Sequence, residues 1–239
     1  MSTAGQGIWI YLAATPLTWL ALTLVAYEAG VVINHAAGRR ALVNPVLIAV
    51  ILIALLLTAT GTSYQRYFDG AQFVHFLLGP ATVALAVPLW RQFHHVRRSW
   101  AAVIVALFAG SFTAVTSAIG IAWLLGATPE MLASLAPKSV TTPIAMAVSA
   151  ELNGLPTVTA VAVIITGVVG AVLGTTVLRV LRVHDPHAVG FALGLTCHGL
   201  GTARAFQISD EAGGFAGLAM GLNGFVTAVV LPLAWVLFS

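Results

Sequence analysis

The sequence contains a series of apolar stretches that are each about as long as a lipid bilayer is thick. The clearest of these stretches cover residues 8–32, 45–60, 71–89, 101–125, 156–177 and 216–238. A transmembrane helix needs about 20 apolar residues, within a working range of about 17 to 25. We therefore expect an all-helical, polytopic membrane protein that forms one transmembrane domain over residues 1–239.

The composition excludes the main soluble classes of protein. Hydrophobic residues make up 59% of the chain and charged residues 7%, whereas a soluble domain is about 25% charged. The net charge is only +3, so nucleic-acid binding is not expected, and the single cysteine, Cys197, excludes a disulfide scaffold. No Walker, serine-hydrolase or metalloprotease motif is present, so we expect neither an enzyme nor a metal or cofactor site.

Two further apolar segments are broken. Residues 139–150 contain Pro143 and three hydroxyl side chains, and residues 188–205 contain four glycines, His198 and Arg204. Arginines follow the apolar stretches that end at residues 32, 89 and 177, and cytoplasmic connections collect such cations.

This orientation rule places the N-terminus outside the cell and makes residues 139–150 begin and end outside. We therefore expect a re-entrant segment there, a crossing by residues 188–205, and about seven spans in the bacterial inner membrane.

The two halves of the chain resemble each other weakly. Residues 78–84 align with residues 200–205, and each aligned segment follows a helix that opens with proline. The charge rule makes the two halves run in opposite directions, which predicts an inverted repeat with broken helices. The first helix (residues 1–40) would be peripheral, with repeats at 44–125 and 156–239 on either side of the re-entrant segment 138–155. The alternative is chance similarity between stretches rich in glycine and alanine.

The segment of residues 197–205 holds the most informative polar side chains. Gly199 and Gly201 are candidate helix breaks, and Thr202 can cap the half-helix that follows. Arg204 can hold a carboxylate, and His198 can take a proton near neutral pH. The alternative for Arg204 is a surface pair with Asp210 or Glu211.

Two other segments predict half-helix starts. Gly79 and Pro80 precede Thr82 in the first half, and Thr141 and Thr142 precede Pro143 in the re-entrant segment. Helix N-termini attract anions, so the starts at Thr82 and Thr202 would converge on one substrate carboxylate. Thr141 and Thr142 would bind a substrate hydroxyl or gate the outer mouth, with capping as the alternative. Lys138 would attract anions at that mouth or lie in water.

Four motifs together resemble the LrgB/CidB family from Asn44 to the C-terminus. They are Asn44-Pro45, residues 79–89 (GPATVALAVPL), residues 139–146 (SVTTPIAM) and residues 198–203 (HGLGTA). Bacterial members of this family are named as antiholin-like or holin-like proteins that modulate murein hydrolases, alongside a small LrgA/CidA membrane partner. A plastid relative exchanges glycolate and glycerate, and bacterial relatives have been linked to pyruvate uptake.

The residues and the resemblance together predict a secondary transporter of small monocarboxylates. Its partners would be a carboxylate anion, the lipid bilayer, further copies of the chain and an LrgA/CidA-type protein. The alternative is a regulator of holin-type pores and autolysis that acts through protein–protein contact.

Overall fold

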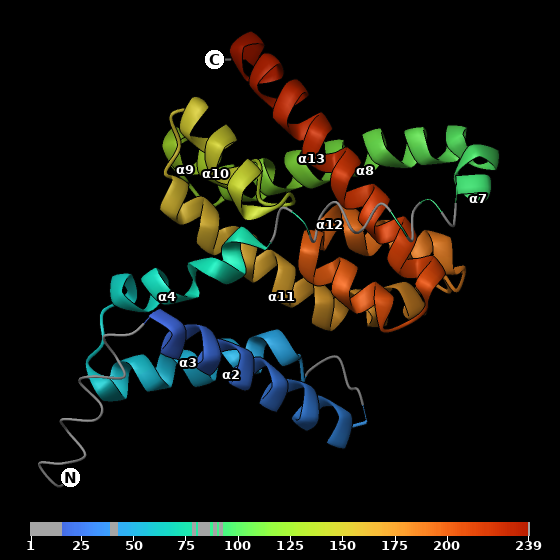
Figure 1. Cartoon of the computed structure of the whole chain (residues 1–239). Helices are drawn as coiled ribbons and strands as arrows, with labels where there is room; N and C mark the ends of the chain where they lie inside the picture. The colour runs from blue at the N-terminus through green and yellow to red at the C-terminus, as the bar shows by residue number, and fades with distance from the viewer. Residues whose placement is uncertain are drawn as a thin grey trace, which may run out of the picture. The chain divides into compact units, whose positions relative to one another are not determined.

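The computed structural model describes residues 16–38, 43–77, 80, 87, 90 and 93–238. The described residues form helices and no strands, and the chain divides into two compact units, Met1–Ala84 and Leu85–Ser239. The first unit contains α2 (Pro16–Ala36), α3 (Pro45–Thr60) and α4 (Tyr64–Phe76). The second contains α7 (Phe93–Arg98), α8 (Trp100–Leu124), α9 (Pro129–Leu135), α10 (Thr142–Glu151), α11 (Pro156–Val180), α12 (Pro186–Phe206) and α13 (Asp210–Phe238), as Figure 1 shows.

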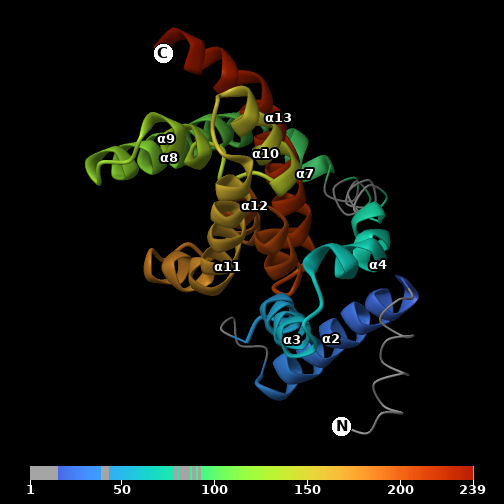
Figure 2. The same cartoon turned by 90° about the vertical axis from the view of Figure 1, so that its left-hand side faces the viewer.

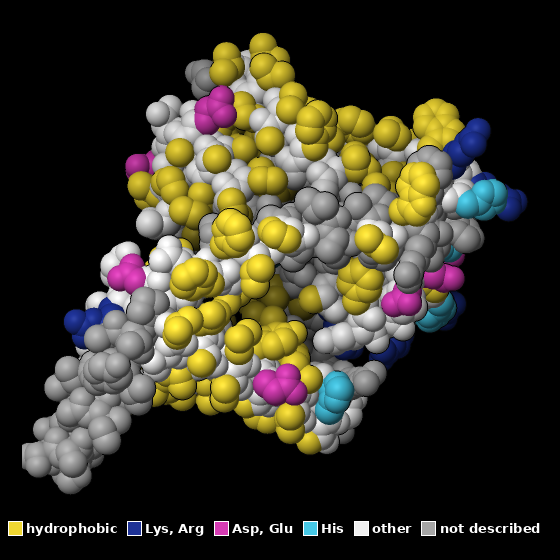
Figure 3. Space-filling model, viewed as in Figure 1, with side chains coloured by type: hydrophobic (Ala, Val, Ile, Leu, Met, Phe, Trp, Pro, Cys, Tyr) yellow, Lys and Arg dark blue, Asp and Glu magenta, His cyan; other side chains and the backbone are white. Residues whose placement is uncertain are grey.

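Long apolar helices confirm the prediction of a polytopic membrane protein. Among the described residues, four helices are long and apolar enough to cross a bilayer: Leu17–Ala36, Trp100–Leu124, Pro156–Val180 and Asp210–Leu237. The apolar helix α3 is shorter. Large hydrophobic side chains lie on the outside of these helices, and they cover much of the face in Figure 3. A lipid environment accommodates such a surface, whereas water does not.

In the first unit, α2 packs against both α3 and α4 (Figure 2). The indole of Trp19 is fully buried and meets the ring of Tyr67 edge to face, with centroids 6.0 Å apart. The amide of Asn34 donates to the carbonyl of Val43 at 2.6 Å, which fixes the end of α2 against the start of α3.

Only part of the predicted span at residues 71–89 is described: α4 ends at Phe76, and residues 78, 79, 81–86, 88 and 89 lie outside the described residues. Gly79 and Thr82 lie outside the described residues, and Pro80 is an exposed helical residue.

In the second unit, α9 and α10 form a helix–turn–helix that does not cross a bilayer. The two helices contain 7 and 10 residues, so they are about 10 and 15 Å long, against a hydrocarbon core of about 30 Å. The hydroxyl of Thr159, near the start of α11, lies 2.9 Å from the carbonyl of Ser134 and 2.7 Å from the hydroxyl of Ser149. Ser134 is in the last turn of α9 and Ser149 is near the end of α10, so the C-terminal ends of the two helices lie at the same level. Residues 136–141 form the tip between the two helices.

Helix α12 reverses its direction at His198. The backbone there has φ 43° and ψ −129°, which is far from helical. A Cβ atom on Gly201 would lie only 2.1 Å from the carbonyl oxygen of Leu193, and Val189 packs in one cluster with Ala205. Residues eight apart in a straight helix are about 12 Å apart along its axis, so residues 186–197 and 199–206 must be antiparallel arms.

This reversal corrects the expectation that residues 188–205 cross the membrane. The segment has enough residues to cross, but the break at His198 sends the chain back to the face from which it came. Helix α13 consequently begins on the same face as α12, not on the opposite one.

The inverted repeat is also wrong in its third helices, because α8 and α13 run parallel. Their contacts advance together along both helices and join residues 103–107 with 215–219, Ser111 with Asn223, and residues 115–119 with 231–235. The predicted repeat requires these two helices to be antiparallel. The cause is the fold-back in α12, which removes one crossing from the second half.

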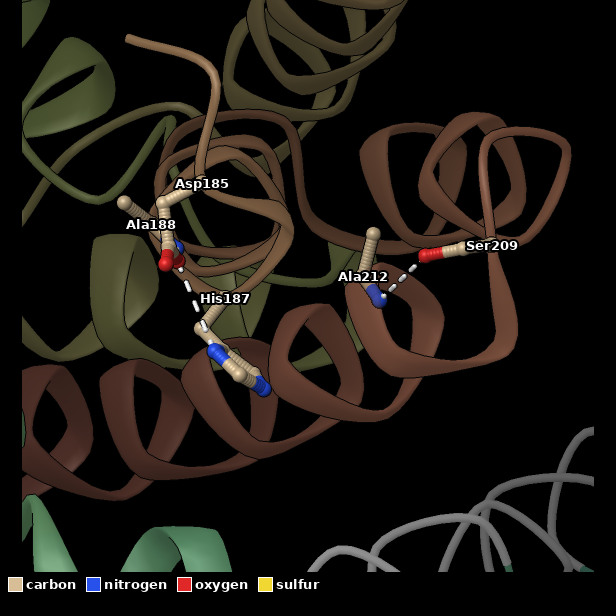
Figure 4. A network of polar contacts seen from close by, with 5 residues as sticks. All are labelled: Asp185, His187, Ala188, Ser209 and Ala212. Atoms are coloured by element: carbon tan, nitrogen blue, oxygen red, sulfur yellow. Dashed lines mark hydrogen bonds and ion pairs between the residues drawn. The ribbon is translucent and has the colours of Figure 1, made fainter.

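The fold-back predicts that the two loops flanking α12 lie on one side of the membrane. Figure 4 shows the caps at these loops: Asp185 bonds the backbone N–H of Ala188, and Ser209 bonds that of Ala212. In a Cys197→Ala background, exposed single cysteines made by His184→Cys and Ile208→Cys should react with an impermeant thiol reagent from the same side. Glu151→Cys, at the other end of the 25-residue helix α11, should react from the opposite side. Labelling of residues 184 and 208 from opposite sides would contradict the hairpin.

Candidate functional site

The two helix breaks meet at the side chain of Asn223, in the middle of α13. Only 2% of Asn223 is exposed. Its Nδ2 donates to the carbonyl of Ser139 at 3.1 Å and to the carbonyl of Leu195 at 2.9 Å. Its Oδ1 accepts from the hydroxyl of Ser111 on α8 at 2.6 Å. One amide therefore connects the tip between α9 and α10, the first arm of α12, and helices α8 and α13.

Both carbonyls are available because the helices are broken. The last four carbonyls of any helix have no partner within it, and Leu195 lies in the last turn before the break at His198. Ser139 lies in the turn between α9 and α10. A buried carbonyl without a partner is costly, so Asn223 is the polar group that allows both breaks to be buried.

His198 lies at the tip of the α12 hairpin, and its side chain contacts α11. Its imidazole is buried, and its Nε2 lies 3.0 Å from the carbonyl of Val163, in the first half of α11. The buried hydroxyl of Thr202 donates to the carbonyl of His198 at 2.9 Å. Thr202 thus bonds back to the tip.

Glycines on α11 make room for this tip. A Cβ atom on Gly167 would lie 2.7 Å from the His198 ring, and a Cβ atom on Gly170 would lie 1.9 Å from the sulfur of Cys197. These glycines therefore set how closely the α12 hairpin approaches α11.

Lys138 lies at the first tip, immediately before Ser139. Its side chain is half-buried, and its Nζ donates to the Ser139 hydroxyl at 3.3 Å. The carbonyl of the next residue, Ser139, bonds Asn223, which also bonds Leu195 of the α12 hairpin. Thr141 is the N-cap of α10 but makes no side-chain capping bond, and Thr142 begins the helix. Both threonines are half-buried, whereas Pro143 is exposed.

Arg204 lies away from the tips, in the last turn of α12. Its Nη1 donates to the side-chain oxygen of Gln207 at 2.7 Å, and its charge interacts with that of Arg179 at the end of α11. The fold-back explains this position, because the second arm carries Arg204 back toward the face at which the hairpin begins. Gly199 is exposed at the tip, and Gly201 is buried against the first arm.

A small hollow lies beside the first tip, and its polar lining residues are Ser111, Ser139, Asn223 and Thr227. In this conformation it is too narrow to hold a water molecule. A solute therefore does not fit into this hollow in the conformation described. Within the part of the chain that the structure describes, no three His, Cys, Asp or Glu side chains group as metal ligands.

The sequence matches the LrgB-like family over residues 23–237. The chain belongs to the LrgB-like family. An uncharacterized protein of Haemophilus influenzae is 36% identical over 192 residues, which cover 80% of this chain and 83% of the relative. The antiholin-like proteins LrgB of Bacillus mycoides and Bacillus cereus are each 31% identical over 219 residues, which cover 92% of this chain and 95% of theirs. No solved structure matches the sequence.

In this LrgB-like chain, two of the residues that sequence reasoning singled out, Thr141 and Thr142, lie at the start of α10, and two others, His198 and Thr202, lie at the tip of the α12 hairpin. The structure adds Asn223 and Ser111, places Lys138 immediately before Ser139, and places Arg204 away from both tips. An amide inside an apolar span was the available signal for Asn223, since such a group needs a partner. Its partners are backbone carbonyls, which no pattern of residue types reveals.

Proposed function

We propose that this protein is a secondary transporter of small monocarboxylates of the glycolate, glycerate or pyruvate type. The observation that carries the proposal is the meeting of two helix breaks on Asn223. Irregular backbone at membrane depth is tolerated only inside protein or along a polar cavity, and transporters place their solute sites at such breaks.

The distribution of charge supports entry of the two hairpins from opposite faces. Helix α11 begins just after α10 and ends just before α12, so its length separates the bases of the hairpins. Arg179 and Arg182 follow α11, and Arg97 and Arg98 precede α8. By the positive-inside rule these ends are cytoplasmic in the bacterial inner membrane, which makes the α12 hairpin cytoplasmic and the α9–α10 hairpin external. The same rule places the N-terminus of the chain outside the cell.

The residues at the tips suit a small anion. The N-terminus of α10 offers backbone N–H groups and the positive end of a helix dipole to a carboxylate. The hydroxyls of Thr141 and Thr142 suit the hydroxyl or keto oxygen of a 2-hydroxy or 2-keto acid. His198, which lies between the second tip and α11, is our candidate for proton coupling.

A second candidate is the regulatory function that the names of the Bacillus relatives indicate. These names, antiholin-like protein LrgB, support this alternative more directly than they support transport. It would act through contacts with an LrgA/CidA-type partner or with further copies of the chain. It predicts that substitutions on lipid-facing surfaces impair the function and that substitutions at the tips of the hairpins do not.

Uptake into proteoliposomes separates the two functions. We expect saturable uptake of radiolabelled glycolate, glycerate or pyruvate that responds to a pH gradient. Thr141→Val with Thr142→Val should lower uptake at least about tenfold, the equivalent of about 1.4 kcal/mol. Thr116→Val, an exposed threonine on α8, is the matched control and should leave uptake unchanged. No uptake by folded protein, alone or with an LrgA-type partner, would favour the regulatory function.

A further inference from the structure

We propose that Lys138 supplies the positive charge that holds the anionic solute between the two hairpin tips. This inference rests on the proposed transport function and names the residue that selects a small monoanion. It replaces Arg204, which the sequence suggested for that role.

The position of Lys138 carries the inference. The residue precedes Ser139, whose carbonyl bonds Asn223, and Asn223 also bonds Leu195 on the α12 hairpin. The next residue, Val140, is buried in one cluster with Val163, whose carbonyl bonds His198. Lys138 therefore lies next to the residues through which the two hairpins meet.

The charge of Lys138 has no carboxylate to balance it. Among the residues that the structure describes, no Asp or Glu oxygen lies within 4 Å of its Nζ. The described carboxylates of the second unit are all exposed: Glu130, Glu151, Asp185, Asp210 and Glu211. An ammonium group at bilayer depth costs at least about 2.5 kcal/mol on insertion scales, so it is retained where it meets a partner or a solute. A bound anion would provide that partner.

The other described cations of the second unit lie at helix ends. Arg97, Arg98, Arg179 and Arg182 are exposed, and Arg204 bonds Gln207 in the last turn of α12. Lys138 alone among these described cations lies at a hairpin tip. One compact ammonium group suits one carboxylate, so this site should prefer monoanions to dianions.

Neighbouring groups complete a site for such an anion. The hydroxyl of Ser139 lies 3.3 Å from the ammonium nitrogen, and α10 begins three residues after Ser139, at Thr142, with Thr141 as its N-cap. The side chain of Thr141 makes no capping bond, so its hydroxyl is available to a solute oxygen. A 2-hydroxy or 2-keto monocarboxylate would place its carboxylate on Lys138 and its second oxygen on this hydroxyl.

Thermal melting of the purified, full-length protein tests the inference without relying on transport. Sodium glycolate and sodium pyruvate are compared with sodium chloride at equal ionic strength. At concentrations about 100 times the dissociation constant, we expect either carboxylate to raise the melting temperature of the wild type by about 5–10 °C. Lys138→Met should abolish this rise, Lys138→Arg should retain part of it, and Arg204→Gln should retain all of it.

The melting temperature without a carboxylate distinguishes binding from a structural role. Removing an unbalanced, partly buried charge should leave the Lys138→Met protein at least as stable as the wild type. A clearly lower melting temperature for this variant in chloride would show that Lys138 holds the fold, and it would overturn the inference.

The remaining outcomes separate this inference from the proposed function. If Lys138→Met keeps the full carboxylate-dependent rise, Lys138 is not the binding charge, while wild-type uptake still establishes transport. If neither carboxylate stabilises the wild type, the anion site at Lys138 is overturned, and the uptake assay alone decides the function.

Discussion

Asn223→Leu is expected to lower the melting temperature by about 5–15 °C and to abolish uptake of any transported solute. Leucine has a similar volume but no N–H group, so the carbonyls of Ser139 and Leu195 would both lose their bonds inside the protein. Each buried carbonyl without a partner costs about 1–3 kcal/mol, and the two costs fall at the points where the helices are broken. Melting in detergent and proteoliposome uptake measure the two effects.

Two variants make the Asn223 result specific. Ser111→Ala removes only one bond to the amide oxygen and should cost about 1 kcal/mol, or about 2–4 °C. Asn223→Asp keeps that acceptor but replaces the amide nitrogen, which donates to both carbonyls, with an oxygen atom. This variant should therefore be at least as destabilising as Asn223→Leu. A leucine variant that melts within about 2 °C of the wild type would show that Asn223 does not hold the hairpins together.

Gly170→Ala is expected to destabilise the second unit by about 1–3 kcal/mol, because the added methyl group would lie 1.9 Å from the Cys197 sulfur. The two contacting positions should therefore be strongly coupled. Cys197→Ala removes the sulfur and leaves the Cys197 Cβ 3.1 Å from the new methyl group. The double variant should recover most of the loss, with a coupling energy of about 1–2 kcal/mol in a double-mutant cycle.

Gly120→Ala is the matched control for this cycle. Gly120 lies within α8, and no atom lies within 4 Å of the position that its Cβ would take. Alanine has a higher helix propensity than glycine, so this variant should be neutral or more stable by up to about 1 kcal/mol. Additive effects of Gly170→Ala and Cys197→Ala would mean that the α12 tip does not pack on α11 as described.

The sequence was sufficient to predict most of the long helices. The apolar stretches 45–60, 101–125 and 156–177 agree with α3, α8 and α11 to within a few residues. Apolar length determines such helices, and prolines at positions 45 and 156 mark two of their starts. Residues 139–150 were also expected not to cross, because the charges on either side leave no crossing for them.

The reversal in α12 could not be predicted in the same way. Glycines around His198 indicate a break, but a mild kink and a full reversal require the same residue types. The reversal depends on Gly201 packing against the Leu193 carbonyl, which is a contact within the folded hairpin. The position of Arg204 and the parallel packing of α8 and α13 follow from the reversal, so the sequence predicted neither.

The amide of Asn223 has two N–H groups, and each hairpin receives one of them. The two bonds use separate donors, so loss of one of them, with a net cost of about 1 kcal/mol, leaves the other hairpin bonded to α13. Under the proposed transport function, the bond to one hairpin can therefore break while the bond to the other is kept. Access to the site from the two faces of the membrane would then not have to open together.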